Sequence, residues 1–382
     1  MNILVVAAQG LYADYSASFV HGQVKEYVRA GHKVRVIVPV AAGKATNAVK
    51  RLSRPIVRAV QDGVEIFYLR YLSLGHLGEN TFNPKSAERT VRLYRRALLK
   101  DFKPDVIHAH AIFFAGNIGR VLKETCKVPL VITTHGGDTD LALLPDKTAE
   151  ARAICDSAEC IVAVSDVYVE KTRRIGSNTG IRCILNGFNI QNACPGKKKK
   201  HSLIQACYLI PRKHVELSIE AASVLREKYP DISLTIVGNG VERERLEKLT
   251  AELGMTDAVN FCGFLPNQDV LEKMAESEIF ILPSVDEGFG IAYIEAMASG
   301  CVAIGTEGEG IGSVIKSGEN GFLTPANDAG AIAAVIERCF EEPDKAREIA
   351  RRGMESARKL TWERNAGQYL ELFEKLLRDA RT

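Results

Sequence analysis

The chain has 382 residues, of which 46% are hydrophobic and 25% charged, and these ordinary globular proportions disfavour intrinsic disorder. Its length favours two domains, and no apolar run reaches the roughly 18 residues of a membrane span. The net charge of +3 conceals a basic first half and an acidic second half. Nine cysteines without a C-x-x-C pair argue against a disulfide scaffold and a zinc site, so we expect a cytosolic protein with reduced thiols.

Short apolar runs alternate with helical patterns along the first half of the chain. The opening run has no basic stretch before it, so we interpret it as a buried first strand and not as a signal peptide. Continuous valine, isoleucine and leucine runs separated by helices predict parallel sheets that are buried on both faces. The strands expected in this half are 2–7, 33–39, 64–69, 105–110, 130–135 and 160–165.

A strongly basic segment, 85-KSAERTVRLYRRALLKDFK-103, has Leu93, Ala97 and Leu98 at helical spacing. The simpler interpretation is a solvated helix that covers the sheet. The alternative is a face that rests on anionic lipid headgroups. Nucleic acid is disfavoured as a partner, because no aromatic-rich basic groove accompanies the charge.

The second half repeats the alternation, with strands expected at 203–209, 232–238, 259–264, 279–284 and 301–305. A charged, proline-containing joint precedes it, and we interpret its four lysines at 197–200 as solvated. The last helical pattern follows the completed second set of strands and is free to pack across to the first domain. We therefore predict an α/β protein with an N-terminal Rossmann-like domain at 1–190, a linker at 191–202, a C-terminal Rossmann-like domain at 203–360 and a final helix at 361–382.

Polar and glycine-rich segments follow the predicted strands, at the edge where open α/β sheets bind ligands, and we expect them to meet at a cleft between the domains. In 286-DEGFGIAYIEAMASG-300, Glu287 lies in a loop and Glu295 in the first turns of a helix. Eight helical residues span roughly 12 Å, so the two carboxylates suit two parts of one extended ligand. Gly288 and Gly290 let backbone N–H groups approach an anion at the helix N-terminus. A nucleotide sugar fits this pattern.

The Glu287-x7-Glu295 pattern resembles the signature of retaining GT-B glycosyltransferases of family 4. The opening of the chain, 18-SFVHGQVKEYVRAGHKVRVIVP-39, is similar to members that build bacterial exopolysaccharides or cell-wall polymers. The resemblance implies the GT-B fold, in which two Rossmann-like domains face each other across a cleft. Over nearly the whole chain, further segments stand in the order of that family: 105-DVIHAH-110, 133-TTHGGD-138, 185-LNGFN-189, 209-LIPRK-213, 236-IVGNGVERERLEKL-249, 261-FCGFLP-266 and 318-GENGFL-323.

The resemblance also implies roles for individual residues. Lys213, with Arg212 beside it, would neutralise the leaving diphosphate, and His135 would help position sugar and acceptor. Front-face attack would retain the anomeric configuration without a protein nucleophile, a metal or another cofactor. The remaining contacts expected with the donor are Glu287 to hydroxyls of the transferred sugar, Glu295 to the ribose, Gly10 near the diphosphate, the backbone around Gly263 and Phe264 at the base, and the loop of Gly288, Phe289, Gly290 and Ile291 at the sugar and phosphates.

The chain departs from the family pattern at Tyr208, where relatives commonly carry a diphosphate-binding arginine, and at His214, where they carry glycine. Tyr208 favours an alternative, a catalytically weak or inactive nucleotide-sugar-binding partner protein. Two purely structural interpretations also stay open. Lys213 would cap the following helix, and His135 would form hydrogen bonds with the backbone at the end of its strand. Asp138-Thr139-Asp140 matches a metal-binding D-x-D, but we interpret it as a loop feature.

Other enzyme classes fit less well. The GNG at 238–240 lacks the spacing of a dinucleotide fingerprint, which disfavours a nicotinamide enzyme. A pyridoxal-dependent phosphorylase is disfavoured because no lysine has a suitable context and the chain is short. The expected partners are a UDP- or GDP-linked sugar and a glycan or lipid-linked acceptor. The expected location is the cytoplasm, with a peripheral position at the inner face of the plasma membrane through 85–103 as a hypothesis.

Overall fold

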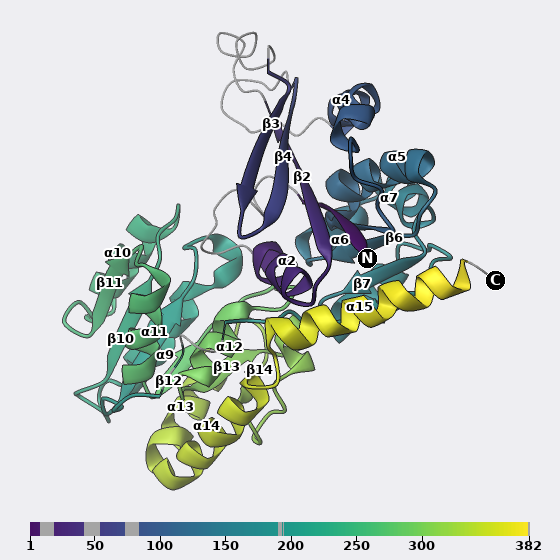
Figure 1. The fold of residues 1–382 in the computed structure, drawn as a ribbon. Helices are drawn as coiled ribbons and strands as arrows, with labels where there is room; N and C mark the ends of the chain where they lie inside the picture. The colour runs from purple at the N-terminus through teal and green to yellow at the C-terminus, as the bar shows by residue number, and fades with distance from the viewer. Residues whose placement is uncertain (8–18, 42–53, 73–83, 190–192, 194, 381–382) are drawn as a thin grey trace. The chain divides into compact units, whose positions relative to one another are not determined.

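The computed structural model of the chain describes residues 1–7, 19–41, 54–72, 84–189, 193 and 195–380. Two compact units divide the chain (Figure 1). The first unit combines Met1–Val164, Tyr168–Gly187 and Trp362–Thr382, and the second combines Ser165–Val167 with Phe188–Thr361. The chain therefore passes into the second unit before the predicted linker and returns to the first unit at its end.

An eight-stranded sheet forms the centre of the first unit, in the order β3-β4-β2-β1-β5-β6-β7-β8. All neighbouring strands are parallel except β3 and β4, which pair antiparallel at one edge. The sequence analysis missed β3, which is half-exposed, and the three-residue β8. The strands are β1 (Asn2–Val6), β2 (Lys33–Ala41), β3 (Ile56–Gln61), β4 (Val64–Tyr71), β5 (Val106–His110), β6 (Leu130–Thr134), β7 (Cys160–Ala163) and β8 (Ile181–Cys183).

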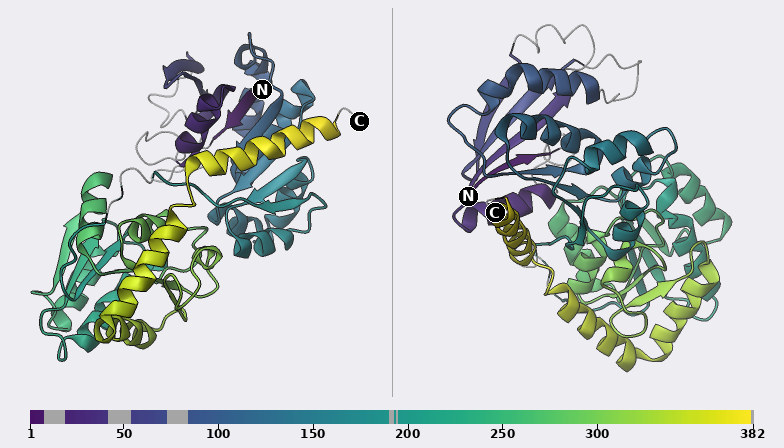
Figure 2. Two further views of the ribbon diagram at one scale, coloured as in Figure 1. Left: turned by 60° about the horizontal axis from the view of Figure 1, so that its bottom comes forward. Right: turned by 90° about the vertical axis from the view of Figure 1, so that its right-hand side faces the viewer.

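Helices cover both faces of this sheet because its strands carry apolar side chains on both sides. Ile3 and Val5 of β1 share a core with α2 (Phe19–Arg29) and α15 (Trp362–Asp379). Leu4 and Val6 point to the opposite core. Figure 2 shows α15 running along the first unit. The opposite core contains α4 (Pro84–Leu98), the π-helix η1 (Ala111–Gly116), α5 (Asn117–Cys126) and α7 (Thr148–Cys155), and the remaining helices are α6 (Gly137–Ala142) and α8 (Asp166–Arg173).

Six parallel strands form the sheet of the second unit, in the order β11-β10-β9-β12-β13-β14. Because the strand order reverses between β9 and β12, these neighbours form the topological switch point where such sheets bind ligands. The short β14 was not predicted. The strands are β9 (Ser202–Ala206), β10 (Ser233–Val237), β11 (Val259–Gly263), β12 (Ile279–Ile281), β13 (Val302–Thr306) and β14 (Phe322–Thr324).

The main core of the second unit lies between its sheet and α9, α10 and α13. On α12, the buried Tyr293 packs its ring 5.6 Å from that of Phe280 on β12. The predicted fold class, two Rossmann-like α/β units, is confirmed. The helices are η3 (Pro211–Lys213), α9 (Val215–Leu225), α10 (Arg243–Glu252), α11 (Asn267–Glu276), α12 (Ile291–Ala298), η4 (Gly310–Ser313), α13 (Ala329–Glu341) and α14 (Pro343–Ala357).

Two local predictions were wrong. On α4 the buried face carries Val91 and Leu98, whereas Leu93 is 72% exposed. In the lysine run, Lys198 is not solvated, because its Nζ donates to the carbonyl oxygens of Met274 at 3.2 Å and Ser299 at 2.9 Å. Among the described helices, none is both long and apolar enough to cross a bilayer.

Candidate active site

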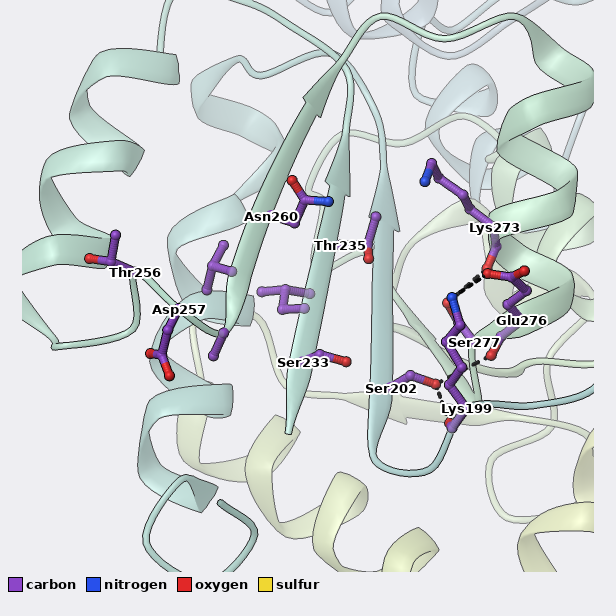
Figure 3. Close-up of a pocket in the computed structure, with 13 residues that line it drawn as sticks. Lys199, Ser202, Ser233, Thr235, Thr256, Asp257, Asn260, Lys273, Glu276 and Ser277 are labelled. Atoms are coloured by element: carbon purple, nitrogen blue, oxygen red, sulfur yellow. Dashed lines mark hydrogen bonds and ion pairs between the residues drawn. The ribbon is translucent and has the colours of Figure 1, made fainter. Parts of the chain in front are cut away.

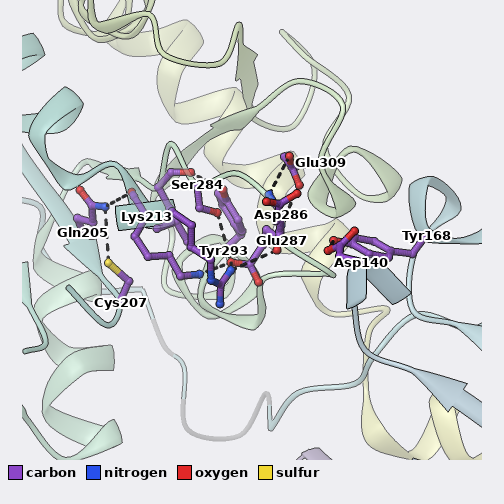
Figure 4. A network of polar contacts seen from close by, with 12 residues as sticks. Asp140, Tyr168, Gln205, Cys207, Lys213, Ser284, Asp286, Glu287, Tyr293 and Glu309 are labelled. Atoms are coloured by element: carbon purple, nitrogen blue, oxygen red, sulfur yellow. Dashed lines mark hydrogen bonds and ion pairs between the residues drawn. The ribbon is translucent and has the colours of Figure 1, made fainter. Parts of the chain in front are cut away.

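Glu287 lies in a strained turn that follows β12, after the short segment 282–285. The preceding Asp286 adopts a φ of 52°, a left-handed conformation that costs free energy for a residue with a Cβ. The carboxylate of Glu309 accepts both backbone N–H groups of the turn, from Asp286 at 3.1 Å and Glu287 at 2.8 Å (Figure 4). Arg212 Nη1 donates to the carbonyl of Asp286 at 3.2 Å, and Gly310 N donates to that of Glu287 at 3.1 Å. These contacts fix the direction of the Glu287 side chain.

The side chain of Glu287 forms an ion pair with Lys213. Lys213 is only 8% exposed, and a buried ammonium needs a charged partner. The same carboxylate oxygen accepts from Ser284 Oγ at 3.3 Å and lies 3.8 Å from Arg212 Nη1. Lys213 follows β9 and Glu287 follows β12, so the switch point brings together three residues that the sequence analysis predicted for the donor site.

Helix α12 begins at Ile291, immediately after this turn, and Gly290 is its N-cap residue. This residue adopts a φ of 79°, and a Cβ there would lie 2.5 Å from the ring of Tyr293. Tyr293 is buried and its hydroxyl donates to the carbonyl of Leu282, the residue after β12. Moving the ring away from a Cβ would therefore break this hydrogen bond and disturb the core. A glycine is therefore required where the loop enters the helix. Of the predicted donor loop, Phe289 turns its side chain into the core, at 3% exposed, which leaves its backbone for a ligand.

Glu295 lies on α12, as predicted, and Asn267 at the start of α11 donates to its Oε1 at 3.0 Å. Burial raises the pKa of Glu295 above its ordinary value, and the hydrogen bond from Asn267 opposes that shift. Gly263 ends β11, and Phe264 lies in the loop between this strand and Asn267. Phe264 is 65% exposed, so its ring is accessible in the second unit.

In the first unit, His135 follows β6 and pairs with His110 at the end of β5. Nδ1 of His110 and Nε2 of His135 share a hydrogen bond of 3.1 Å, and the two rings are nearly parallel. Within the described part of the chain, His135 Nδ1 and His110 Nε2 are buried without a hydrogen-bond partner. Burial lowers the pKa of His135 to about 3, so the ring is neutral at physiological pH.

The D-x-D of this unit does not form one site. Asp138 accepts the backbone N–H of His135 at 2.8 Å and that of Ile112 at 3.0 Å, so it anchors the histidine turn. Asp140 instead accepts from the hydroxyl of Tyr168 at 2.6 Å and from Lys171 Nζ at 2.9 Å. The described ranges contain no cluster of three or more histidine, cysteine or acidic side chains arranged for a metal ion.

Several contacts of the site were not found from sequence. The contact of His110 with His135 was not predicted, nor were the roles of Ser284 and Asn267. Glu309, in 305-GTEGEGIG-312, was not predicted as part of the site either. Gly10, predicted near the diphosphate, lies outside the described residues.

A polar groove of about 410 Å³ lies elsewhere in the second unit (Figure 3). Ser202, Ser233 and Val259 begin β9, β10 and β11, and all three line it, so the groove opens at the amino ends of the strands. Lys199 and Glu276 form an ion pair across 2.6 Å at its side. Because Lys213 and Glu287 follow the opposite ends of their strands, this groove is not part of the candidate site.

Two family models match the chain. Residues 16–187 match the model for a glycosyl transferase 4-like domain, and residues 189–356 match that for glycosyl transferases group 1. The chain is 24% identical over 304 residues to a D-inositol 3-phosphate glycosyltransferase of Corynebacterium urealyticum. This match covers 71% of this chain and 72% of that protein. It is 30% identical over 171 residues to the putative glycosyltransferase EpsD of Bacillus subtilis, or 45% of this chain and 44% of that protein.

Structures of other proteins share the fold. A sucrose-phosphate synthase from Thermosynechococcus elongatus matches with a TM-score of 0.81 and 21% identity, over 99% of this chain and 100% of that one. HepE from Anabaena, crystallised with UDP-glucose, matches with a TM-score of 0.74 and 18% identity, over 98% of this chain and 100% of that one.

Proposed function

Because the chain belongs to the GT-B glycosyltransferases, we propose that it moves a sugar from a nucleoside-diphosphate donor to a glycan or lipid-linked acceptor, with retention of configuration. The observation that carries the proposal is the Lys213–Glu287 ion pair at the switch point of the second sheet. The strained turn that presents Glu287 is held by hydrogen bonds to its backbone N–H and carbonyl groups. Relatives of this fold bind UDP and UDP-glucose, which supports a nucleotide sugar as donor.

In the proposed complex, the cations of Lys213 and Arg212 face the diphosphate. Negative charge grows on the diphosphate as the bond from the anomeric carbon to the phosphate oxygen breaks. Fixed cations and the backbone N–H groups at the start of α12 therefore stabilise the transition state more than the ground state. The acceptor hydroxyl attacks from the same face, and its proton passes to the departing phosphate oxygen. Glu287 holds sugar hydroxyls and Glu295 holds those of the ribose.

We propose that this turnover needs no divalent metal, because the charge that a metal would neutralise is met by Lys213 and Arg212. In the first unit, His135 is proposed to position the sugar and acceptor. Its Nε2 is occupied by His110, so Nδ1 is the atom left to meet a hydroxyl group. A neutral ring suits this role, since it can either donate or accept a hydrogen bond there.

Transfer and donor-hydrolysis assays with UDP-, GDP- and ADP-linked sugars, with and without EDTA, test the proposal. Lys213→Ala and Glu287→Ala are expected to lower kcat about 100-fold or more while the fold survives. Lys248→Ala, an exposed lysine of the same unit, is the matched control and keeps wild-type kinetics. Wild-type kinetics in Lys213→Ala would remove this residue from the site, and loss of turnover in EDTA would refute the metal-free step.

The alternative is a binding protein without turnover, which Tyr208 favours because the resemblance described above implies a diphosphate-binding arginine at this position. That alternative predicts that a nucleoside diphosphate raises the melting temperature, since a ligand bound to the native state stabilises it. It also predicts no transfer or hydrolysis across a broad acceptor panel. Turnover that depends on Lys213 and Glu287 would exclude it.

We further propose that the enzyme works in the cytoplasm, at the inner face of the plasma membrane, through α4. One exposed stripe along α4 and the turn that follows it contains Lys85, Arg89, Leu93, Arg96 and Lys100, so four cations accompany one exposed leucine. The acidic Glu88 lies off this stripe and pairs with Arg92 at 3.0 Å. A cationic stripe with an apolar centre is suited to anionic headgroups and would bring a lipid-linked acceptor close.

Flotation with phosphatidylglycerol and phosphatidylcholine vesicles tests this contact. Binding is expected only to the anionic vesicles and is expected to weaken with salt. The variant Arg89→Glu/Arg96→Glu should lose it. Lys248→Glu/Lys316→Glu changes the net charge equally on exposed positions of the second unit and should keep it. Equal flotation of both variants would exclude α4 as the contact.

A further inference from the structure

Two aromatic side chains stand in solvent at the carboxyl edge of the second sheet. Tyr208 is 62% exposed and Phe264 is 65% exposed. Their ring centroids lie 5.4 Å apart, with the planes at 68°, so one ring meets the other edge-on. Tyr208 follows β9 and Phe264 follows β11, two strands on either side of β10. An edge-on pair leaves a ring face uncovered, so apolar aromatic surface is open to a ligand.

The backbone beneath the rings is held by the GNG turn that follows β10. Leu209 N donates to the carbonyl of Asn239 at 3.0 Å, and Gly238 N donates to that of Gly263 at 2.8 Å. A Cβ at Gly238 would lie 1.8 Å from the carbonyl oxygen of Cys207, so only glycine allows this approach. The turn therefore ties the loops of both rings together. The backbone under both rings is therefore preorganised, which lowers the conformational entropy that is lost when a ligand binds.

The two rings adjoin the candidate donor site along the chain. Tyr208 precedes Arg212 by four residues and shares its loop, which ends at Lys213. Phe264 precedes Asn267 by three residues, and Asn267 holds Glu295 at 3.0 Å. A nucleotide with its diphosphate at Lys213 and its ribose at Glu295 therefore has its flat base near the loops that carry these rings.

We infer that the ring pair of Tyr208 and Phe264 forms the stacking surface for the nucleobase of the donor, with each residue supplying one aromatic ring. This inference rests on the proposed function. Stacking suits the geometry because every base has a planar face, and it acts without a charge on the base. The pair therefore determines nucleotide affinity, while the phosphate contacts depend on Arg212 and Lys213.

Calorimetric titrations with UDP, GDP, ADP and inorganic pyrophosphate test this inference. Tyr208→Ala and Phe264→Ala should weaken the nucleoside diphosphate that binds best by between about 5-fold and 150-fold, the range for loss of one base–aromatic stack. Tyr208→Phe keeps the ring and should bind within about two-fold of wild type. Pyrophosphate, which has no base, should bind all variants equally. Val241→Ala removes the 81% exposed side chain of the neighbouring loop and is the control.

Each outcome is decisive. If wild type binds a nucleoside diphosphate and Tyr208→Ala binds it equally well, the inference is wrong while the proposed function stands. If nucleotide affinity is unchanged but the KM for a glycan acceptor rises, the rings bind the acceptor and the base assignment falls. If wild-type protein binds none of the three nucleotides, the proposed function fails together with the inference. Equal weakening of pyrophosphate in Tyr208→Ala would show a damaged phosphate site and overturn the stacking role.

Discussion

Nδ1 of His110 lies 3.1 Å from Nε2 of His135, and this hydrogen bond determines which nitrogen of His135 is left for a ligand. The two residues end neighbouring strands, β5 and β6, and Asp138 accepts the backbone N–H of His135. The ring is therefore oriented from two sides. His110 is thus a positioning residue for the group that we propose to meet the sugar and acceptor.

His110→Leu is expected to lower kcat for transfer about ten-fold, because the ring of His135 loses a hydrogen bond that is worth about 1 kcal/mol or more at a buried site. His110→Asn keeps a donor and an acceptor near the position of Nδ1 and should recover most of the rate. Steady-state kinetics with saturating donor measure the effect. The donor Kd of both variants should equal that of wild type, and an unchanged kcat in His110→Leu would contradict the positioning role.

Acid should destabilise the protein through its buried histidines. Burial lowers the pKa of both His108 and His135 to about 3, against about 6.5 in the unfolded chain. Between these values the unfolded chain binds more protons than the native protein, so stability falls as the pH falls, by up to about 1.4 kcal/mol per pH unit for each histidine. Urea unfolding at about pH 7 and about pH 5 measures the loss.

His108→Gln tests the source of this loss. His108 is fully buried and bonds Thr133 at 2.8 Å, and glutamine offers a hydrogen-bonding group without a titration. The free energy of unfolding of the variant should fall about 2 kcal/mol less than that of wild type over the same pH interval. Parallel pH dependences for the two proteins would show that His108 does not contribute.

Glu309 should be required for the turn that presents Glu287. Glu309→Ala removes the acceptor of two backbone N–H groups in the turn where Asp286 adopts its left-handed conformation. We expect kcat/KM to fall about ten-fold or more and the free energy of unfolding to fall by about 1–2 kcal/mol. Glu307→Ala, an exposed acid two residues earlier, should stay within about 0.5 kcal/mol of wild type. Full activity in Glu309→Ala would show that the turn holds without this carboxylate.

Lys198 should stabilise the second unit, although it lies in a run of four lysines. Burial lowers the pKa of its ammonium group, which nevertheless donates to two carbonyl oxygens. Lys198→Met removes one hydrogen bond from each of these oxygens and should lower the free energy of unfolding by about 1–3 kcal/mol. The exposed Lys200→Met is the matched control and should change it by less than about 0.5 kcal/mol. Equal effects in urea unfolding would show that Lys198 is solvated after all.

The sequence by itself determined the longer buried strands, the two-unit α/β class and the positions of Lys213, Glu287 and Glu295 after strands or at a helix start. Apolar runs, glycines and helix patterns are local signals, and they can be read wherever burial is continuous. The same approach failed at β3, β8 and β14, which are short or half-exposed, and at the buried face of α4, where several arrangements of apolar residues suit one helix.

Only the tertiary structure decided which side chains meet. His110 and His135 are 25 residues apart, Glu309 and Glu287 22, and Asn267 and Glu295 28. Each pair comes together because crossover helices place two strand ends at one edge of a sheet. The order of strands in a sheet depends on the packing of both faces at once, and no local pattern of residues contains that information.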